Sequence, residues 1–418
     1  MEFKKYKIKD IGEVVTGFTP SKKEKDLYGF TFPFITPSDI TNSKYVNPKR
    51  FLSEKAISKK EKKVCSKSSV GVSCIGSDLG KAFFIQKISF TNQQINTITN
   101  IKKNFDPEYI YYKIKTLRNY FHRIADGSTM PIINKSKFEN LSLDIPSLKN
   151  QKKISNILSV LDNKIEINKK IIANLEEFSQ TLFKRWFVDF EFPDENGNPY
   201  KSSGGEMVDS ELGEIPKGWN VKNLDDIANY VNGLAMQKFK PTDNQNSLPV
   251  VKIKELKNGS TDENSNRCTS EIPDKALIND GDIIFSWSAT LLVKMWCGGK
   301  AGLNQHLFKV SSDKYPKWFY YYWTKRYIDY FIGIANDKAT TMGHINRKHL
   351  SHAKILIPND STLEKFSRTF DDLLEKELSV SKESKRLIEL RDTLLPKLMS
   401  GEIEIPDDIE VNEDELSI

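Results

Sequence analysis

The segment Gly76-Ser77-Asp78-Leu79-Gly80-Lys81-Ala82 has residue types that could do chemistry, because glycines beside a lysine can hold nucleotide phosphates. A working phosphate loop has four residues between its glycines and a Ser or Thr after the lysine, whose hydroxyl binds magnesium. Here one residue too few separates Gly76 from Gly80, and Ala82 has no hydroxyl. The segment therefore predicts a turn and no nucleotide site.

A second candidate is Asp106-Pro107-Glu108-Tyr109, which has part of the Asp/Asn-Pro-Pro-Tyr/Phe motif of adenine methyltransferases. Glu108 stands at the second proline, and no glycine-rich cofactor loop precedes the segment. Proline is favoured in the first turn of a helix. A helix start therefore explains these residues better than a methyltransferase site does.

The third candidate is a histidine cluster, His344, His349 and His352, whose spacing could bring two metal ligands onto one helical face. No Cys or further His lies nearby in the sequence, which argues against a metal. No Ser-His-Asp or paired-carboxylate arrangement stands out either. We therefore expect no catalytic residue, cofactor site or metal site in this chain. The four cysteines lie outside metal-ligand and redox spacing, so zinc and disulfides are not expected: Cys65, Cys74, Cys268 and Cys297.

Charge points to a different kind of function. The net charge of the 418 residues is +7, but residues 400–418 hold eight acids and no base, so the remainder carries +15. Such a basic body suits a polyanion, since each neutralised phosphate releases counterions; a solvated lysine-rich surface is the alternative. No run reaches the roughly 18 apolar residues of a membrane span, and Met1-Glu2-Phe3-Lys4-Lys5 lacks a signal peptide's apolar core. We expect a cytoplasmic protein with no membrane association.

The elements that must position any site occur twice. Ile11–Gly17 is echoed by Ile227–Gly233, 216 residues further on, and Asn92–Ile95 by Asn304–Leu307, 212 residues further on. Pro107–Tyr112 matches Pro316–Tyr321 at an offset of 209, and the proline predicts both helix starts. Short β-rich runs, Phe83–Ile85 and Asp282–Trp287, alternate with turns. This period is too long for a solenoid, so it predicts two homologous α/β domains.

A long heptad run follows each domain and predicts a helix that pairs with another. If a pseudo-twofold axis relates the halves, the two helices must run antiparallel as a coiled coil; two separate amphipathic helices are the alternative. The apolar seam consists of Ile154, Leu158, Leu161, Ile165, Ile172, Leu175 and Leu182 in the first helix and Phe366, Phe370, Leu373, Val380, Leu387 and Leu394 in the second.

Breakers and linkers set the boundaries. Pro396 should break the second helix, with Gly401 after it, whereas the first helix has no such proline and can run through Trp186 and Phe187 toward Pro193. Residues 194–210 read as a flexible linker. The expected organisation is residues 1–146 (first domain), 147–190 (first helix), 191–217 (linker), 218–358 (second domain), 359–399 (second helix) and 400–418 (acidic tail).

This arrangement resembles the specificity subunit of Type I DNA restriction-modification systems. The phrases that carry the resemblance span nearly the whole chain: Thr16–Lys23, Gly127–Ile132, Leu212–Trp219 and Leu394–Ile403. The Pro-Leu-x-Glu-Gln that usually follows the recognition domain appears here as Ser147-Leu148-Lys149-Asn150-Gln151 and is lost in the second copy.

The resemblance implies a non-catalytic subunit that binds double-stranded DNA, with each α/β domain a target-recognition domain for one half of a split, asymmetric site. It implies that the paired helices act as a ruler and as a dock for two modification subunits, which bind S-adenosylmethionine. Restriction subunits, which use ATP and magnesium, can join such complexes. A helix over residues 150–189 would be roughly 60 Å long, enough to hold two modules about one duplex turn apart.

Candidate DNA contacts follow from residue type and position. Lysines in equivalent polar loops suit phosphates, namely Lys22, Lys23 and Lys25, and Lys238 and Lys240. The remaining candidates are Gln94, Ser128, Thr129, His306, Thr340, Thr341, His344, Arg347 and Lys348. Asn92-Gln93 and Asn304-Gln305 occur in both copies, and shared residues cannot explain different sequence preferences. Hydrogen bonds within the fold are therefore favoured for them.

Two other functions remain open at this point. The chain could be the detached recognition region of a fused restriction-methylation enzyme, whose catalytic motifs would lie on a longer polypeptide. It could also be a coiled-coil assembly protein whose basic domains bind RNA or nothing. Salt-dependent DNA binding and co-purification with a methyltransferase subunit would discriminate among the three.

Overall fold

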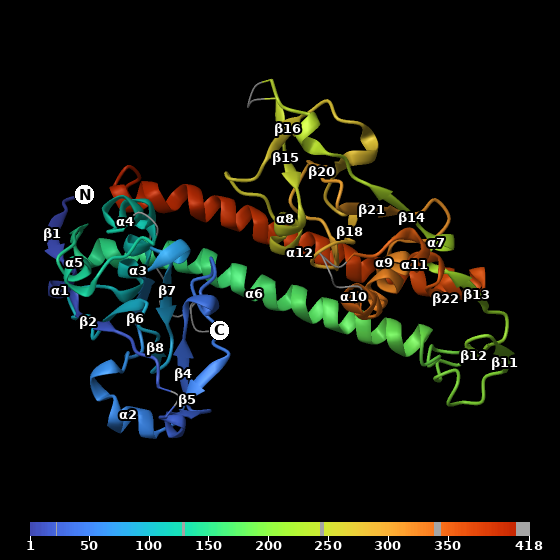
Figure 1. The fold of residues 1–418 in the computed structure, drawn as a ribbon, viewed down its shortest axis with the longest axis horizontal. Coiled ribbons are helices and arrows are strands. Elements are labelled where there is room, and N and C mark those ends of the chain that lie inside the picture. Colours follow the sequence, from blue (N-terminus) through green and yellow to red (C-terminus); the bar gives the residue numbers. More distant parts are fainter. Residues whose placement is uncertain (22, 128–129, 243–245, 338–343, 407–418) are drawn as a thin grey trace. The chain divides into compact units, whose positions relative to one another are not determined.

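The computed structural model describes residues 1–418 except 22, 128–129, 243–245, 338–343 and 407–418 (Figure 1). It divides into two compact units, each with its own core: Met1–Ile167 with Arg386–Ile418, and Asn168–Lys385. Each unit contains one α/β domain and a segment of both long helices. The domain boundaries therefore cut across the helices, where the heptad pattern gives no signal.

The first unit contains two four-stranded sheets, with strand orders β2-β9-β6-β7 and β3-β5-β4-β8, and a separate β1-β10 pair. Every residue of β6 and β9 is buried, as expected for central strands that are covered on both faces. The strands are β1 (Lys4–Lys7), β2 (Glu13–Thr16), β3 (Tyr28–Gly29), β4 (Phe32–Ile35), β5 (Arg50–Leu52), β6 (Ser69–Ser73), β7 (Ala82–Ile85), β8 (Phe90–Thr91), β9 (Ile95–Thr99) and β10 (Ser142–Ile145). The helices are α1 (Ile8–Ile11), α2 (Lys55–Lys59), α3 (Pro107–Thr116), α4 (Arg118–Ile124), α5 (Lys135–Glu139) and the start of α6 (Leu148–Phe187).

The second unit repeats this plan, with sheets β14-β21-β18-β19 and β16-β15-β20-β17 and a β13-β22 pair. Its strands are β11 (Met207–Ser210), β12 (Gly213–Pro216), β13 (Asn220–Asn223), β14 (Asn229–Asn232), β15 (Ser247–Val251), β16 (Arg267–Thr269), β17 (Leu277–Ile278), β18 (Ile283–Ser286), β19 (Leu292–Met295), β20 (Ala301–Leu303), β21 (Leu307–Ser311) and β22 (Lys354–Ile357). Its helices are α7 (Leu224–Ile227), α8 (Ile253–Asn258), α9 (Lys317–Arg326), α10 (Ile328–Asp337), α11 (Arg347–Ser351) and most of α12 (Asp360–Ser400).

Strand register confirms the internal repeat. Glu13 of β2 lies opposite Thr99 of β9, and Asn229 of β14 lies opposite Ser311 of β21, which are the 216- and 212-residue offsets of the sequence. The two runs expected to be β-rich are strands β7 and β18. Both domains are therefore the same α/β fold, as the sequence predicted.

The repeated glycines have a steric cause. A Cβ on Gly17 would lie 2.1 Å from the carbonyl oxygen of Thr91, and one on Gly233 would lie 2.2 Å from that of Leu303. In both domains the chain leaving the first strand of the main sheet crosses the backbone that enters the turn before the next strand. Only glycine permits this approach.

The tyrosine-rich helices cover the main sheets, but their alignment differs from the expected one. α3 starts at Pro107 after the N-cap Asp106, whose carboxylate accepts from the Tyr109 N–H at 2.7 Å. α9 starts at Lys317, and Pro316 is its N-cap. The offset between the two helices is therefore 210 residues, and the sequence alignment of one proline with the other was wrong by one.

Every predicted apolar seam position is buried or half-buried. In the first unit, Ile154 and Leu158 of α6 join a core that also contains Leu395 and Leu398 of α12. In the second unit, Phe183 of α6 lies 6.1 Å from Phe370 of α12, ring centroid to ring centroid. The remaining seam residues are Leu161, Ile165, Leu387 and Leu394 in the first unit, and Ile172, Leu175, Leu182, Phe366, Leu373 and Val380 in the second.

Pro396 does not end α12, contrary to expectation, because the helix runs on to Ser400. A proline this close to a helix end removes one backbone donor and leaves the last turn in place. The stop is Gly401, whose φ of +80° lies in the left-handed region that favours glycine. The first helix ends at Phe187, short of Pro193.

The segment expected to be a flexible linker is ordered. Phe192 stacks on Tyr200 at 4.6 Å and on Trp219 at 5.3 Å, and β11 pairs with β12 as a hairpin. The polar Asp194–Pro199 run forms a turn whose backbone is bonded to the Asp194 carboxylate. The Gly and Asn composition was read as flexibility, whereas the aromatic residues on either side fix the segment to the core of the second unit.

Candidate nucleic-acid interface

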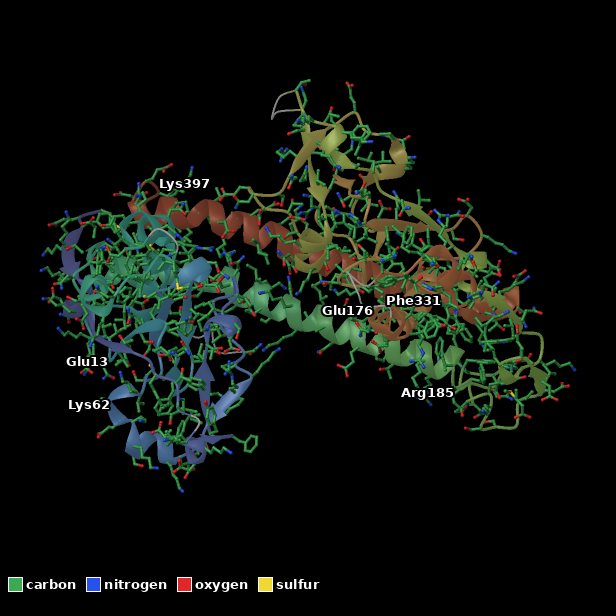
Figure 2. All side chains as sticks on the ribbon, viewed as in Figure 1. Glu13, Lys62, Glu176, Arg185, Phe331 and Lys397 are labelled. Atoms are coloured by element: carbon green, nitrogen blue, oxygen red, sulfur yellow. The ribbon has the colours of Figure 1, made fainter. Side chains whose placement is uncertain are left out.

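The lobe built on the smaller sheet of the first domain exposes several lysines, among them Lys62 (Figure 2). Lys23 and Lys25, predicted to contact phosphates, are both exposed, and Lys22 lies outside the described residues. A hydrogen bond from Lys59, at 2.7 Å, is the main cause of a lowered pKa at Asp26. No ion pair is found for Lys23 or Lys25 within the described part of the chain, so both remain available to an anion.

The matching loop of the second domain has the same character. Lys238 ends a short 3-10 helix, Met236–Lys238, and is exposed, as is Lys240. Both domains thus place cationic side chains on the loop that follows the repeated glycine. The loops differ in length and sequence, whereas the strands on either side are equivalent.

A conserved-geometry turn links the two sheets of each domain. The Asn92 side-chain oxygen accepts from the Gln94 N–H at 2.9 Å, and the Asn304 oxygen accepts from the His306 N–H at 3.3 Å. The Asn92 N–H donates to Ile35 and the Asn304 N–H donates to Val251, at 2.9 and 3.1 Å. These asparagine oxygens serve the fold, as the repetition indicated.

Two further segments meet this turn. In the first domain, Ile75 pairs with Ile132, and the Ile133 N–H donates to the carbonyl of Cys74 at 2.9 Å. The Cys74 N–H donates to the carbonyl of Gln94 at 2.8 Å. We call the place where Cys74, Gln94 and Ile132 converge the first junction. It joins the end of β6, the turn after β8 and the segment before α5.

The second domain contains the equivalent place. Ser288 pairs with His344, and the Ile345 N–H donates to the carbonyl of Trp287 at 3.1 Å. The ring of Trp287 lies 5.9 Å from that of His306 and 6.3 Å from that of His344, between centroids. We call Trp287, His306 and His344 the second junction.

The second junction unites two predicted site residues and one that sequence reasoning missed. His306 and His344 were candidates, and both are exposed. Trp287 is half-buried and stood in the sequence only as the last residue of a β-rich run. Its signal was available in the repeat, since it corresponds to Cys74 once the registers of β6 and β18 are matched.

Helix α11 follows the second junction and carries the other predicted cations. Lys348 is exposed, whereas the Arg347 guanidinium donates to the backbone carbonyl of Tyr230 at 3.0 Å. His349 accepts from the Asn346 N–H through Nδ1 at 3.1 Å, so one of its two nitrogens already serves the start of the helix. The remaining candidates lie outside the described residues: Ser128, Thr129, Thr340 and Thr341.

The described residues offer little else that would suggest catalysis. No group of three or more His, Cys, Asp or Glu side chains suited to a metal ion occurs among them. Gly76–Asp78 forms a short 3-10 turn, and Pro107 opens α3, as the sequence predicted for both segments. Among the described helices, none is both long and apolar enough to cross a membrane.

The arrangement of two equivalent α/β domains, each with exposed cations beside a variable junction, defines a duplicated recognition protein. Residues 1–177 and 216–390 each match the Type I restriction modification DNA specificity domain. The chain belongs to this family and carries two of its recognition domains.

Similar proteins cover almost the whole chain. The MjaIX Type I specificity subunit of Methanocaldococcus jannaschii is 32% identical over 411 residues, which are 96% of this chain and 93% of that protein. The HindI specificity subunit of Haemophilus influenzae is 26% identical, over 88% of this chain and 94% of its own. The solved S subunit from M. genitalium shares the fold, with a TM-score of 0.56 at 17% identity, and covers 95% of this chain and 96% of its own.

Proposed function

We propose that this chain is the non-catalytic DNA-recognition subunit of a Type I restriction-modification complex. Each α/β domain binds one half of a bipartite, asymmetric site in double-stranded DNA. The subunit docks two modification subunits, which supply S-adenosylmethionine and methylate the DNA, and restriction subunits that use ATP and magnesium can join. The observation that carries the proposal is the pair of structurally equivalent domains whose equivalent exposed side chains differ.

Equivalence and difference argue together. Two domains with the same strand registers present their exposed loops and junctions in the same geometry, so they can approach DNA in the same way. Residues that differ at those places, such as Gln94 and His306, give each domain its own preference. A site read by two unlike modules is split and non-palindromic.

The long helices supply the distance between the modules. Within the first unit Asp162 of α6 contacts Arg391 of α12, and within the second unit Trp186 of α6 contacts Phe366 of α12. The α12 residue number falls as the α6 number rises, which supports an antiparallel coiled-coil pair. At 1.5 Å per residue, the 40 residues of α6 extend over about 60 Å.

That length exceeds one turn of duplex DNA, about 35 Å, and so suits two modules that bind on one face of the duplex. The helices also present the surface on which two copies of one partner can dock, since each domain repeats the same helix environment. We infer that the modification subunits bind along this helix pair.

Electrostatics supports the choice of polyanion. Lys23, Lys25, Lys238 and Lys240 lie in equivalent exposed loops, where each phosphate contact would release counterions. Binding should therefore weaken steeply with salt. Substituting Ala for Lys25 should reduce the slope of log affinity against log salt by about one and leave the recognised sequence unchanged.

The test is to purify this chain with and without its modification subunit and to measure methyl transfer from labelled S-adenosylmethionine to DNA. The chain alone should transfer no label, and the complex should methylate a single bipartite sequence, read by sequencing of methylated bases. Transfer by the chain alone would show an enzyme. Failure to bind DNA, alone or in the complex, would leave an assembly protein.

A further inference from the structure

We propose that base identity is read at the two junctions: by Trp287, His306 and His344 in the second domain, and by Cys74, Gln94 and Ile132 in the first. The proposal rests on the proposed DNA-recognition function and names side chains that set its specificity. In the second domain the two histidines contact base edges, and Trp287 is a positioning residue that holds their imidazoles.

The first argument is that the backbone of the two junctions is the same. Ile75 pairs with Ile132 as Ser288 pairs with His344, and Ile133 donates to Cys74 as Ile345 donates to Trp287. The asparagine that orders the turn is also the same in both domains. Equivalent backbones hold the three side chains of each junction in equivalent positions relative to their domain.

The second argument is that none of the three side chains is shared. A half-buried indole replaces a buried thiol, an imidazole replaces an amide, and a second imidazole replaces an isobutyl-sized apolar group. A residue needed by the fold would recur at such closely matched positions, as Gly17 recurs in Gly233. Variation over a fixed frame is the pattern that two different base preferences require.

The third argument is chemical. A neutral imidazole offers one donor and one acceptor, and a glutamine amide offers both as well, so each can pair with a base edge in the major groove. Ile132 is 38% exposed and is suited to an apolar contact such as the thymine methyl group. His306 and His344 are exposed, and both lie beside the ring of Trp287.

The ring contacts explain how exposed side chains could discriminate. A solvent-exposed histidine samples several rotamers, and fixing it on binding costs free energy. The Trp287 indole, which packs against Phe308 at 5.8 Å, presents a fixed surface that limits the orientations of both imidazoles. The adjacent cation Lys348 lies four residues after His344 and is placed to contact the neighbouring phosphate.

The experiment compares methylated sequences of the assembled complex containing the wild-type chain or a single variant. His306→Ala and His344→Ala should each lower discrimination by about 5- to 100-fold at one or two base pairs of the second half-site. Gln94→Ala and Ile132→Ala should do so in the first half-site only. Trp287→Phe should keep the wild-type preference, whereas Trp287→Cys should relax both positions that the histidines read.

Matched controls separate reading from folding. His352→Ala removes an exposed histidine at the end of α11, and Gln86→Ala an exposed amide of the first domain, so neither should change the sequence. Thermal unfolding of each variant checks that the histidine and glutamine substitutions leave stability unchanged. A wild-type complex that methylates no defined sequence would contradict the proposed function itself. A defined wild-type sequence that all four alanine variants retain would overturn the junction proposal alone.

Discussion

Arg391 of α12 and Asp162 of α6 form an ion pair of 2.7 Å in which the arginine side chain is 7% exposed and the aspartate 3%. The second carboxylate oxygen of Asp162 accepts from the Tyr112 hydroxyl at 2.7 Å. The pair thus ties both long helices to the tyrosine-rich helix α3 of the first domain. A buried pair that fits one alignment disfavours a slipped one, because slippage would leave both charges unpaired.

Removing one partner should destabilise the protein strongly. Arg391→Ala leaves a buried carboxylate without its counter-charge, and we expect the free energy of unfolding to fall by about 3–5 kcal/mol in urea titrations. The double variant Asp162→Leu with Arg391→Met should recover most of that loss, since it leaves no buried charge. Lys354→Ala breaks an exposed pair with Glu211 and should cost less than about 1 kcal/mol. A similar small loss for Arg391→Ala would argue against a buried pair.

The repeated glycines predict matched steric failures. Gly17→Ala and Gly233→Ala each place a Cβ within 2.2 Å of a backbone carbonyl oxygen, so each should destabilise its own domain by about 3 kcal/mol or more. Gly333→Ala is the control, because nothing lies within 4 Å of its Cβ and it sits in helix α10. That change should raise stability by up to about 1 kcal/mol. Equal thermal stability of all three variants would contradict the close crossing.

Glu377 gives the second unit a predicted pH dependence. Burial raises the pKa of this carboxyl to about 7, with Glu176 of α6 adding repulsion and Lys325 and Lys294 opposing the shift (Figure 2). The folded state therefore binds a proton that the unfolded chain has released. This contribution to stability is complete below the unfolded pKa of about 4.5 and is lost as pH rises through 7.

Substitution of Glu377 by Gln isolates that contribution. The variant cannot ionise, so its free energy of unfolding relative to wild type should rise between pH 5 and pH 8, by an amount on the order of 3 kcal/mol. Urea unfolding at several pH values measures the difference, which removes the effects of other titrating groups common to both proteins. A difference that stays constant over this range would show that Glu377 is ionised throughout.

The helix pair predicts how the spacer should change. Four residues inserted after Lys169 in α6, together with four after Lys382 in α12, lengthen both helices by roughly 6 Å near the Asn168–Glu383 contact. This equals nearly two base pairs, so methylated sites should keep both half-sites and gain one or two base pairs between them. The insertion in α6 alone should lose activity, because it misaligns the seam. An active double insertion with the original spacer would leave the helices only as a docking surface.

Much of this architecture could be predicted because the repeat compares the chain with itself. Gly17 and Gly233 recur because one carbonyl excludes any Cβ, and the heptad seam recurs because both helices bury one face. The errors arose where local composition outweighed tertiary packing. Pro396 was read as a stop although the last helical turn tolerates a missing donor. The polar run after Phe192 was read as flexible although its aromatic neighbours fix it.

The candidate site was harder to predict, since its parts come from three separate segments of each domain. His306 and His344 were singled out by residue type, but nothing in the sequence places Trp287 between them. That juxtaposition depends on the register of β18 against β21 and on the bridge from Ser288 to His344. A repeat alignment at single-residue accuracy would have paired Trp287 with Cys74 and shown the difference.

The most direct measurement is the methylated sequence of a complex whose second domain has been exchanged. Residues 219–357 are replaced by the matching domain of a relative with a known different site, and methylated bases are mapped across a genome. The account predicts that one half of the bipartite sequence changes to the relative's half-site while the other half and the spacer stay as they were. A change in both halves, or in neither, would contradict the reading of each half-site by its own domain.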